Sequence, residues 1–144
     1  MPMSSSVTSK RAAEPVGSFP HARRVGNLLF LSGIGPRLRG SKEIPGVTFD
    51  AAGNVVAKDI IAQCESVFAN VRAILEDAGT TWERLVDVTV FLTDMKTDFE
   101  AYNRLWALHF RDAQPCRTTV EVNCLPTPIA IELKCIATMP EERT

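Results

Sequence analysis

The sequence predicts an α+β protein in which two amphipathic helices pack on one face of a mixed β-sheet. Segments 60–78 and 99–110 repeat apolar residues at three- and four-residue steps, which is typical of helices with one buried face. Alternating or continuous apolar runs, which are typical of strands, occur in segments 28–31, 85–92, 117–124 and 129–138. Two helices can cover only one face of such a sheet, so an α+β sandwich is the simplest arrangement.

Length and charge limit the classes of protein to consider. At 144 residues the chain suits one domain. We expect this domain over residues 16–139, with flexible polar tails at 1–15 and 140–144. The net charge of −1, with scattered basic residues, argues against a nucleic-acid partner. No apolar run is long enough to span a bilayer, and the N-terminus lacks a signal-peptide core. We therefore expect a cytoplasmic protein without nucleic-acid or membrane partners.

The first half of the domain should consist of short strands. Residues 17–24 are expected to form an irregular or edge segment, because Pro20 lacks a backbone donor. The apolar run 28–31 ends at Ser32-Gly33, which predicts a buried strand whose glycine end admits another chain or a ligand. Segments 47–49 and 54–56 should form a hairpin-like pair of strands.

Local signals mark the ends of the two helices. Asp59 is a suitable N-cap for the first helix, and Gly79 lies where a left-handed C-terminal glycine belongs. For the second helix, Thr97 and Glu100 have the spacing of a capping box. This helix should end before Pro115, and His109 on its apolar side should belong to the core.

The strand that follows begins with Arg117, two residues after Pro115. A guanidinium keeps its charge and presents a planar fork that suits a carboxylate. The sequence therefore predicts that a small acidic molecule would bind at Arg117. The alternative is a structural ion pair with an acidic neighbour.

Neither a metal nor a disulfide is expected. The cysteines form no CxxC pair and have no histidine at metal-ligand spacing. As buried thiols behave like small hydrophobes, we expect these residues to be buried and reduced: Cys64, Cys116, Cys124 and Cys135. The strand faces that carry Thr119, Glu121 and Ile136 are neither strongly polar nor strongly apolar. Such a face is often covered by another copy of the chain, so a homo-oligomer is expected.

Several motifs in order resemble one family. They are Leu31-Ser32-Gly33, the stretch from Val88 to Met95, Tyr102-Asn103, the stretch from Pro115 to Val122, and Ile131-Glu132. Together they resemble the RidA (YjgF) family of reactive-intermediate deaminases, over residues 19–137. The resemblance implies a chorismate-mutase-like fold with a six-stranded sheet, and a homotrimer with sites between subunits. It also implies hydrolysis of enamines and imines to ketones and ammonia, without a metal or organic cofactor.

The resemblance suggests roles for individual residues. Arg117 would bind a substrate carboxylate, and Glu132 would orient and deprotonate a water. The further substrate-binding candidates are Phe19, His21, Ser32, Gly33, Asn103 and Thr119. Three alternatives stay open. Glu132 could pair structurally with Lys134 of a neighbour or with Arg117, Asn103 could only bond backbone, and His21 could lie on the surface.

Two segments look like the 2-aminomuconate deaminase branch, namely 19–23 and the insertion 36–46. General members carry a tyrosine where this chain has Phe19. We therefore expect 2-aminomuconate, a dicarboxylate enamine from aromatic catabolism, to be hydrolysed to 4-oxalocrotonate and ammonia. A diacid needs a second cation, and the candidates are His21, Arg23, Arg24, Arg37, Arg39 and Lys42. The alternatives are a general 2-iminoacid deaminase and a non-catalytic trimer that binds keto acids.

Overall fold

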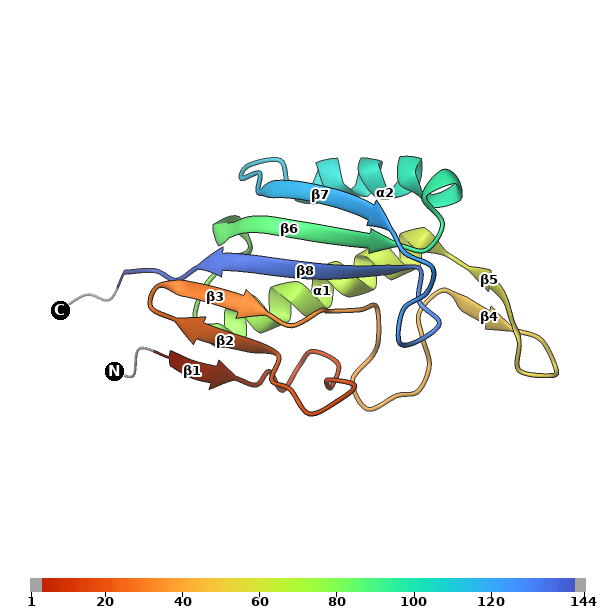
Figure 1. Cartoon of the computed structure of the whole chain (residues 1–144), viewed down its shortest axis with the longest axis horizontal. Coiled ribbons are helices and arrows are strands. Elements are labelled where there is room, and N and C mark those ends of the chain that lie inside the picture. Colours follow the sequence, from red (N-terminus) through yellow and green to blue (C-terminus); the bar gives the residue numbers. More distant parts are fainter. Residues whose placement is uncertain (1–3, 142–144) are drawn as a thin grey trace.

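The computed structural model describes residues 4–141 and contains a six-stranded mixed sheet with two helices on one face (Figure 1). The elements are β1 (Ser4–Val7), β2 (Ala22–Val25), β3 (Leu28–Leu31), β4 (Val47–Phe49), β5 (Val55–Lys58), α1 (Ile60–Ala78), the 3₁₀ turn η1 (Trp82–Arg84), β6 (Leu85–Leu92), α2 (Met95–His109), β7 (Cys116–Glu121) and β8 (Ile131–Thr138). The strand order is β1-β2-β3-β8-β6-β7. Only β6 and β7 are parallel neighbours in this sheet. The predicted α+β arrangement is confirmed.

The predicted pair of short strands forms a separate hairpin. β4 and β5 pair only with each other, and they extend beyond the end of the main sheet (Figure 1). In the described part of the chain, no helix is long and apolar enough to cross a membrane.

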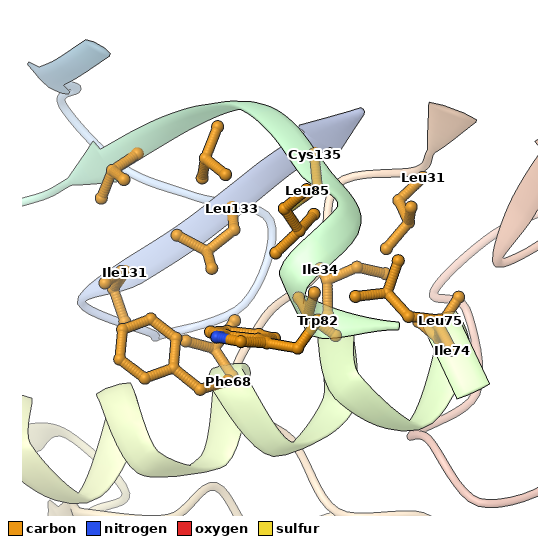
Figure 2. Packing of buried hydrophobic residues seen from close by; sticks show 14 of the residues in the cluster. Leu31, Ile34, Phe68, Ile74, Leu75, Trp82, Leu85, Ile131, Leu133 and Cys135 are labelled. Carbon is orange, nitrogen blue, oxygen red and sulfur yellow. The ribbon is translucent and has the colours of Figure 1, made fainter. Parts of the chain in front are cut away.

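The core lies between the helices and the sheet (Figure 2). Phe68 of α1 packs edge-on against Trp82 at 5.8 Å and against Phe110 at 6.2 Å between ring centroids. Leu133 and Cys135 of the central strand β8 are almost fully buried beneath these rings and their neighbours. The helix-facing side of the sheet is therefore buried within the chain, and no helix among residues 4–141 covers its opposite face.

The helix caps agree with the sequence at α1 and differ at α2. Asp59 accepts a hydrogen bond from the Ile61 amide at 3.0 Å, and Gly79 adopts a left-handed φ of 92°. In α2 the N-cap is Asp94, whose carboxylate accepts from the Thr97 amide at 3.1 Å. The predicted capping box at Thr97 and Glu100 is wrong, because Asp94 begins the helix earlier and already binds the Thr97 amide.

The expected flexible tail at residues 1–15 is wrong for the residues that the structure describes. β1 pairs antiparallel with β2, and Ser9 and Ala12 are buried. Ser9 donates its hydroxyl to Asp77 at 2.7 Å, and Arg11 forms an ion pair with Asp77 at 2.8 Å. The polar composition of this segment is matched by specific partners on α1. Residues 1–3 and 142–144 of the expected tails lie outside the described residues.

His21 fixes the same N-terminal segment from within. Its ring is buried, its Nδ1 accepts from the Ser9 amide at 2.9 Å, and its Nε2 donates to the Ala13 carbonyl at 2.7 Å. Replacing it leaves two buried backbone groups without partners. We expect His21→Ala to lower the free energy of unfolding by about 2–4 kcal/mol, measured by urea denaturation. Arg24→Ala, which loses one exposed bond to the Gly26 carbonyl, is the control. An unchanged midpoint for His21→Ala would contradict this assignment.

Candidate functional site

The residues predicted to form the site lie in two groups on different parts of the sheet. One group, which we call the arginine cluster, consists of Arg117, Thr119, Asn103 and Tyr102. The other, the glutamate cluster, consists of Glu132, Gly33, Ser32, Phe19 and Arg37.

In the arginine cluster, the guanidinium of Arg117 forms no ion pair with a carboxylate of the described residues. Arg117 Nη1 donates to Asn103 Oδ1 at 2.9 Å. The guanidinium lies over the rings of Tyr102 and Trp106, at 5.2 and 5.1 Å from their centroids. Within residues 4–141, no carboxylate lies within the 4.0 Å of an ion pair with Arg117. The structural ion pair considered from the sequence is therefore not formed inside the chain, and donors remain available for a ligand.

Thr119 lies beside this arginine and is fixed by Tyr102. The two hydroxyl groups are 2.8 Å apart. Burial raises the pKa of the Tyr102 phenol, while the hydrogen bond to Thr119 and the charge of Arg117 lower it. The phenol therefore stays neutral near pH 7 and acts as a rigid support. The structure places Asn103 and Thr119 next to Arg117, and their predicted role in substrate binding stays a prediction.

Glu132 is the centre of the glutamate cluster. The residue is half-buried in β8, and this burial raises the pKa of its carboxyl above the ordinary value. The positive charge of Arg37 acts in the opposite direction. Gly33 lies directly against the carboxylate, because a Cβ added at Gly33 would be 3.0 Å from Glu132 Oε2. A raised pKa at a partly open position is what a general base requires.

Two of the predicted residues, Ser32 and His21, form structural hydrogen bonds within the chain. Ser32 donates its hydroxyl to the Pro20 carbonyl at 2.7 Å, so that proton is not available to a ligand. His21 uses both ring nitrogens within the chain, so its predicted role as a surface residue or a substrate-binding cation is wrong. Phe19 is 41% exposed and lines a small pocket with Gly33 and Arg37.

The register of the sheet separates Arg117 from Glu132. In β6, Val88 opposes Arg117, and Phe91 opposes Glu132. Val88 and Phe91 are three residues apart, so their side chains lie on opposite faces. Arg117 is therefore on the helix-facing side at the β7 edge, and Glu132 is on the open face. The alternative that they pair with each other within one chain is wrong, because β6 lies between their strands.

The other alternative for Glu132, an ion pair with Lys134 of a neighbour, stays a prediction, and no such pair forms within residues 4–141. Lys134 donates to the Leu31 carbonyl and forms no ion pair with Glu132 there. Glu132 therefore has no cationic partner within 4.0 Å among residues 4–141. The described residues also contain no group of three His, Cys, Asp or Glu side chains that could hold a metal. Cys64 and Cys135 are buried as expected, but the expected burial is wrong for Cys116, which lies on the edge strand β7, and for Cys124, because both are exposed.

The family model described as "Endoribonuclease L-PSP" matches residues 9–139 of the chain. The chain belongs to this family. It is the family of the RidA, YjgF and RutC proteins, as expected from the resemblance. A RutC family protein of Pyrococcus abyssi is 34% identical over 131 residues, covering 91% of this chain and 94% of that protein. The chloroplastic Reactive Intermediate Deaminase A of Arabidopsis thaliana is 32% identical, covering 92% of this chain and 65% of that protein.

Solved structures of RidA-type proteins share the fold. The Escherichia coli YjgF gene product superposes with a TM-score of 0.79 at 29% identity, covering 93% of this chain and 98% of that one. Escherichia coli TdcF, solved with bound serine, gives a TM-score of 0.81 at 27% identity, covering 94% and 99%. These likenesses support relation to reactive-intermediate deaminases. The narrower 2-aminomuconate branch stays a prediction.

Proposed function

We propose that this RidA-family protein is a cofactor-independent deaminase that hydrolyses the enamine and imine forms of 2-amino carboxylic acids. The observation that carries the proposal is the pair of complementary groups on the sheet. Arg117 is a cation with no protein carboxylate, and Glu132 is a half-buried carboxylate with a raised pKa. The first suits a substrate carboxylate and the second suits a reacting water.

The reaction follows from these two roles. An enamine tautomerises to an imine, whose carbon is electrophilic. With Arg117 holding the carboxylate, Glu132 removes a proton from water as the water oxygen attacks that carbon. The proton then returns to the nitrogen of the resulting carbinolamine. The hydroxyl proton of the carbinolamine then passes through Glu132 to the nitrogen as the C–N bond breaks, so that ammonia leaves, a ketone remains, and one water is consumed for each ammonia released.

Two copies of the chain would complete one site. Arg117 and Glu132 lie on opposite faces of one sheet, so to act on one substrate molecule the arginine cluster of one subunit would meet the glutamate cluster of another. The open face supports such an assembly, since it carries the half-exposed apolar side chains Phe30, Phe91, Val120 and Ile136. A closed homotrimer, as the family resemblance implies, would contain three equivalent sites.

A dicarboxylate such as 2-aminomuconate is the finer candidate substrate. Two observations support it. Phe19 presents an apolar ring to the pocket beside Gly33, and Arg37 brings a second positive charge close to Glu132. A muconate skeleton has an apolar middle between two carboxylates, which matches this combination of groups. The general substrates are 2-iminoacids with one carboxylate, such as the imine of 2-aminoacrylate.

The test is turnover of freshly generated 2-aminoacrylate and 2-aminomuconate. We expect the protein to accelerate ammonia release and the loss of ultraviolet absorbance above the spontaneous rate. Mass measurement at micromolar concentration should show a trimer. A monomer would overturn the shared site. If keto acids raise the thermal midpoint and no turnover is seen, the protein is a non-catalytic trimer that binds keto acids, and the deaminase proposal is wrong.

A further inference from the structure

Arg37 occupies a loop that is held rigidly next to the glutamate cluster. The side chain of Asn70, on α1, donates to the Gly35 carbonyl at 3.0 Å and to the Arg37 carbonyl at 2.8 Å. The same amide accepts from the Ala13 amide at 3.2 Å. Two of these hydrogen bonds fix the backbone from which the Arg37 side chain extends, and the third joins Asn70 to the N-terminal segment. A binding group on such a fixed backbone loses little entropy when a ligand arrives.

The guanidinium of Arg37 is partly buried without an ion-pair partner. Its Nη2 donates to the Glu14 carbonyl at 2.8 Å, and no carboxylate of residues 4–141 lies within 4.0 Å. Burial lowers the pKa of the group, and the charges of Glu14 and Glu132 raise it. A guanidinium carries five N–H donors, so a single carbonyl leaves most of them free. Burying an unpaired charge is costly unless something pairs with it, and this cost indicates an anionic ligand.

Arg37 also lines both a small pocket and a second cleft. With Gly33 and Phe19 it lines the small pocket, and Gly33 touches the Glu132 carboxylate. On its other side, Arg37 lines a cleft of ≈ 380 Å³ whose wall includes the apolar side chains of Val16 and Phe49. An anion bound at Arg37 would therefore lie near the glutamate cluster and beside an apolar wall.

We propose that Arg37 binds a second carboxylate of the substrate and gives the enzyme its preference for dicarboxylic enamines. The inference rests on the proposed deaminase function. In this arrangement Arg117 of a neighbouring subunit holds the carboxylate next to the reacting carbon. Arg37 holds the distal one, in the same subunit as Glu132.

The other basic residues of this region are less suited to that role. Arg39 donates to the Ser9 and Ala12 carbonyls and lies 3.5 Å from Glu14, so it serves the N-terminal segment. Arg23 donates to Ser4, and Arg24 donates to the Gly26 carbonyl. Lys42 lines the second cleft but is exposed. Sequence reasoning could not separate these candidates, because they differ in their partners and not in their charge.

The experiment compares Arg37→Gln with wild type on 2-aminomuconate and on 2-aminoacrylate. We expect KM for the dicarboxylate to rise about 10- to 100-fold, with kcat/KM for the monocarboxylate nearly unchanged. Arg37→Lys keeps the charge without the planar guanidinium, so its KM for the dicarboxylate should lie between those of wild type and Arg37→Gln. Arg39→Gln removes the same charge from the same loop and is the matched control. Equal losses on both substrates would overturn the proposal, as would a selective loss in Lys42→Gln with normal Arg37→Gln.

A binding readout separates this inference from the deaminase function. Muconate and sorbate share a six-carbon diene, and only muconate has the second carboxylate. We expect muconate to stabilise the wild-type protein against heating more than sorbate does, and Arg37→Gln to remove the difference. If wild type shows no turnover but this pattern holds, the deaminase function fails and the carboxylate site stands. If turnover occurs and muconate has no advantage, Arg37 has no such role.

Discussion

Replacing Arg117 with alanine should reduce kcat/KM for enamine hydrolysis by about 100- to 10,000-fold. The estimate follows from two charge-assisted hydrogen bonds to one carboxylate, at about 1.5–3 kcal/mol each. Arg117 donates to Asn103 and lies over aromatic rings without any carboxylate partner in the described chain. The loss should therefore concern the substrate. The measurement is initial rate against concentration of freshly generated 2-aminoacrylate.

Matched variants decide whether the effect belongs to the carboxylate fork. Arg104→Ala removes an exposed positive charge from the same region of α2 and should keep wild-type kinetics. Arg117→Lys keeps the charge but not the planar fork, so it should recover only part of the activity. A trimer and a thermal midpoint like those of wild type would show that Arg117→Ala folds and assembles. Wild-type rates in such a variant would contradict the assignment of Arg117.

The elements of the fold were largely predictable because their signals are local. The apolar stripe of α1, its Asp59 cap and the Gly79 end all lie within one segment, and the structure confirms each of them. The alternation in β6 and β8 likewise reports one buried face. β1 was missed because its four residues are polar or small and carry no such alternation. β1 forms because it pairs with β2, and a local sequence pattern gives no information about such pairing.

The site was predictable in its residues but not in its arrangement. Arg117, Glu132, Asn103 and Thr119 were found from motifs, and the structure places all but Glu132 together. The sequence alone suggested that Glu132 follows Arg117 on a neighbouring strand. The actual order puts β6 between β7 and β8, which sends the two side chains to opposite faces. Strand order is a long-range property, so it was not visible in the pattern of either strand.

The same limit explains Arg37. Six basic residues looked equivalent in the sequence because charge was the only property that could be compared. Hydrogen bonds from Asn70, which is 33 residues away along the chain, select one of them by fixing its backbone near Glu132. A conformationally irregular loop between β3 and β4 gives no periodic signal that would predict this contact.

Replacing Glu132 with glutamine should lower kcat by about 100- to 10,000-fold, which is the range for removing a general base. Glutamine keeps the size of the side chain next to Gly33 but cannot accept a proton from water. Glu83→Gln makes the same change at an exposed carboxylate on η1 and should keep wild-type activity. Single-turnover rates measure the chemical step. A variant with normal kcat would show that Glu132 is not the base.

The pH dependence tests the same assignment through the environment of the carboxyl. Glu132 must be ionised to act, so the rate should rise with pH through its folded pKa, which burial raises above the ordinary value. In the isolated chain, ionisation of Glu132 lowers the free energy of unfolding as pH rises, although it raises the reaction rate. The folded state holds the proton more tightly than the unfolded state, so this group destabilises the fold as pH rises from the unfolded pKa through the folded one. Glu132→Gln removes that penalty and should unfold no more easily than wild type near neutral pH.

Because Arg37 lowers the pKa of Glu132, Arg37→Gln should move the rise in rate to higher pH. A profile that Arg37→Gln leaves in place would show that another group limits the reaction on its acid side.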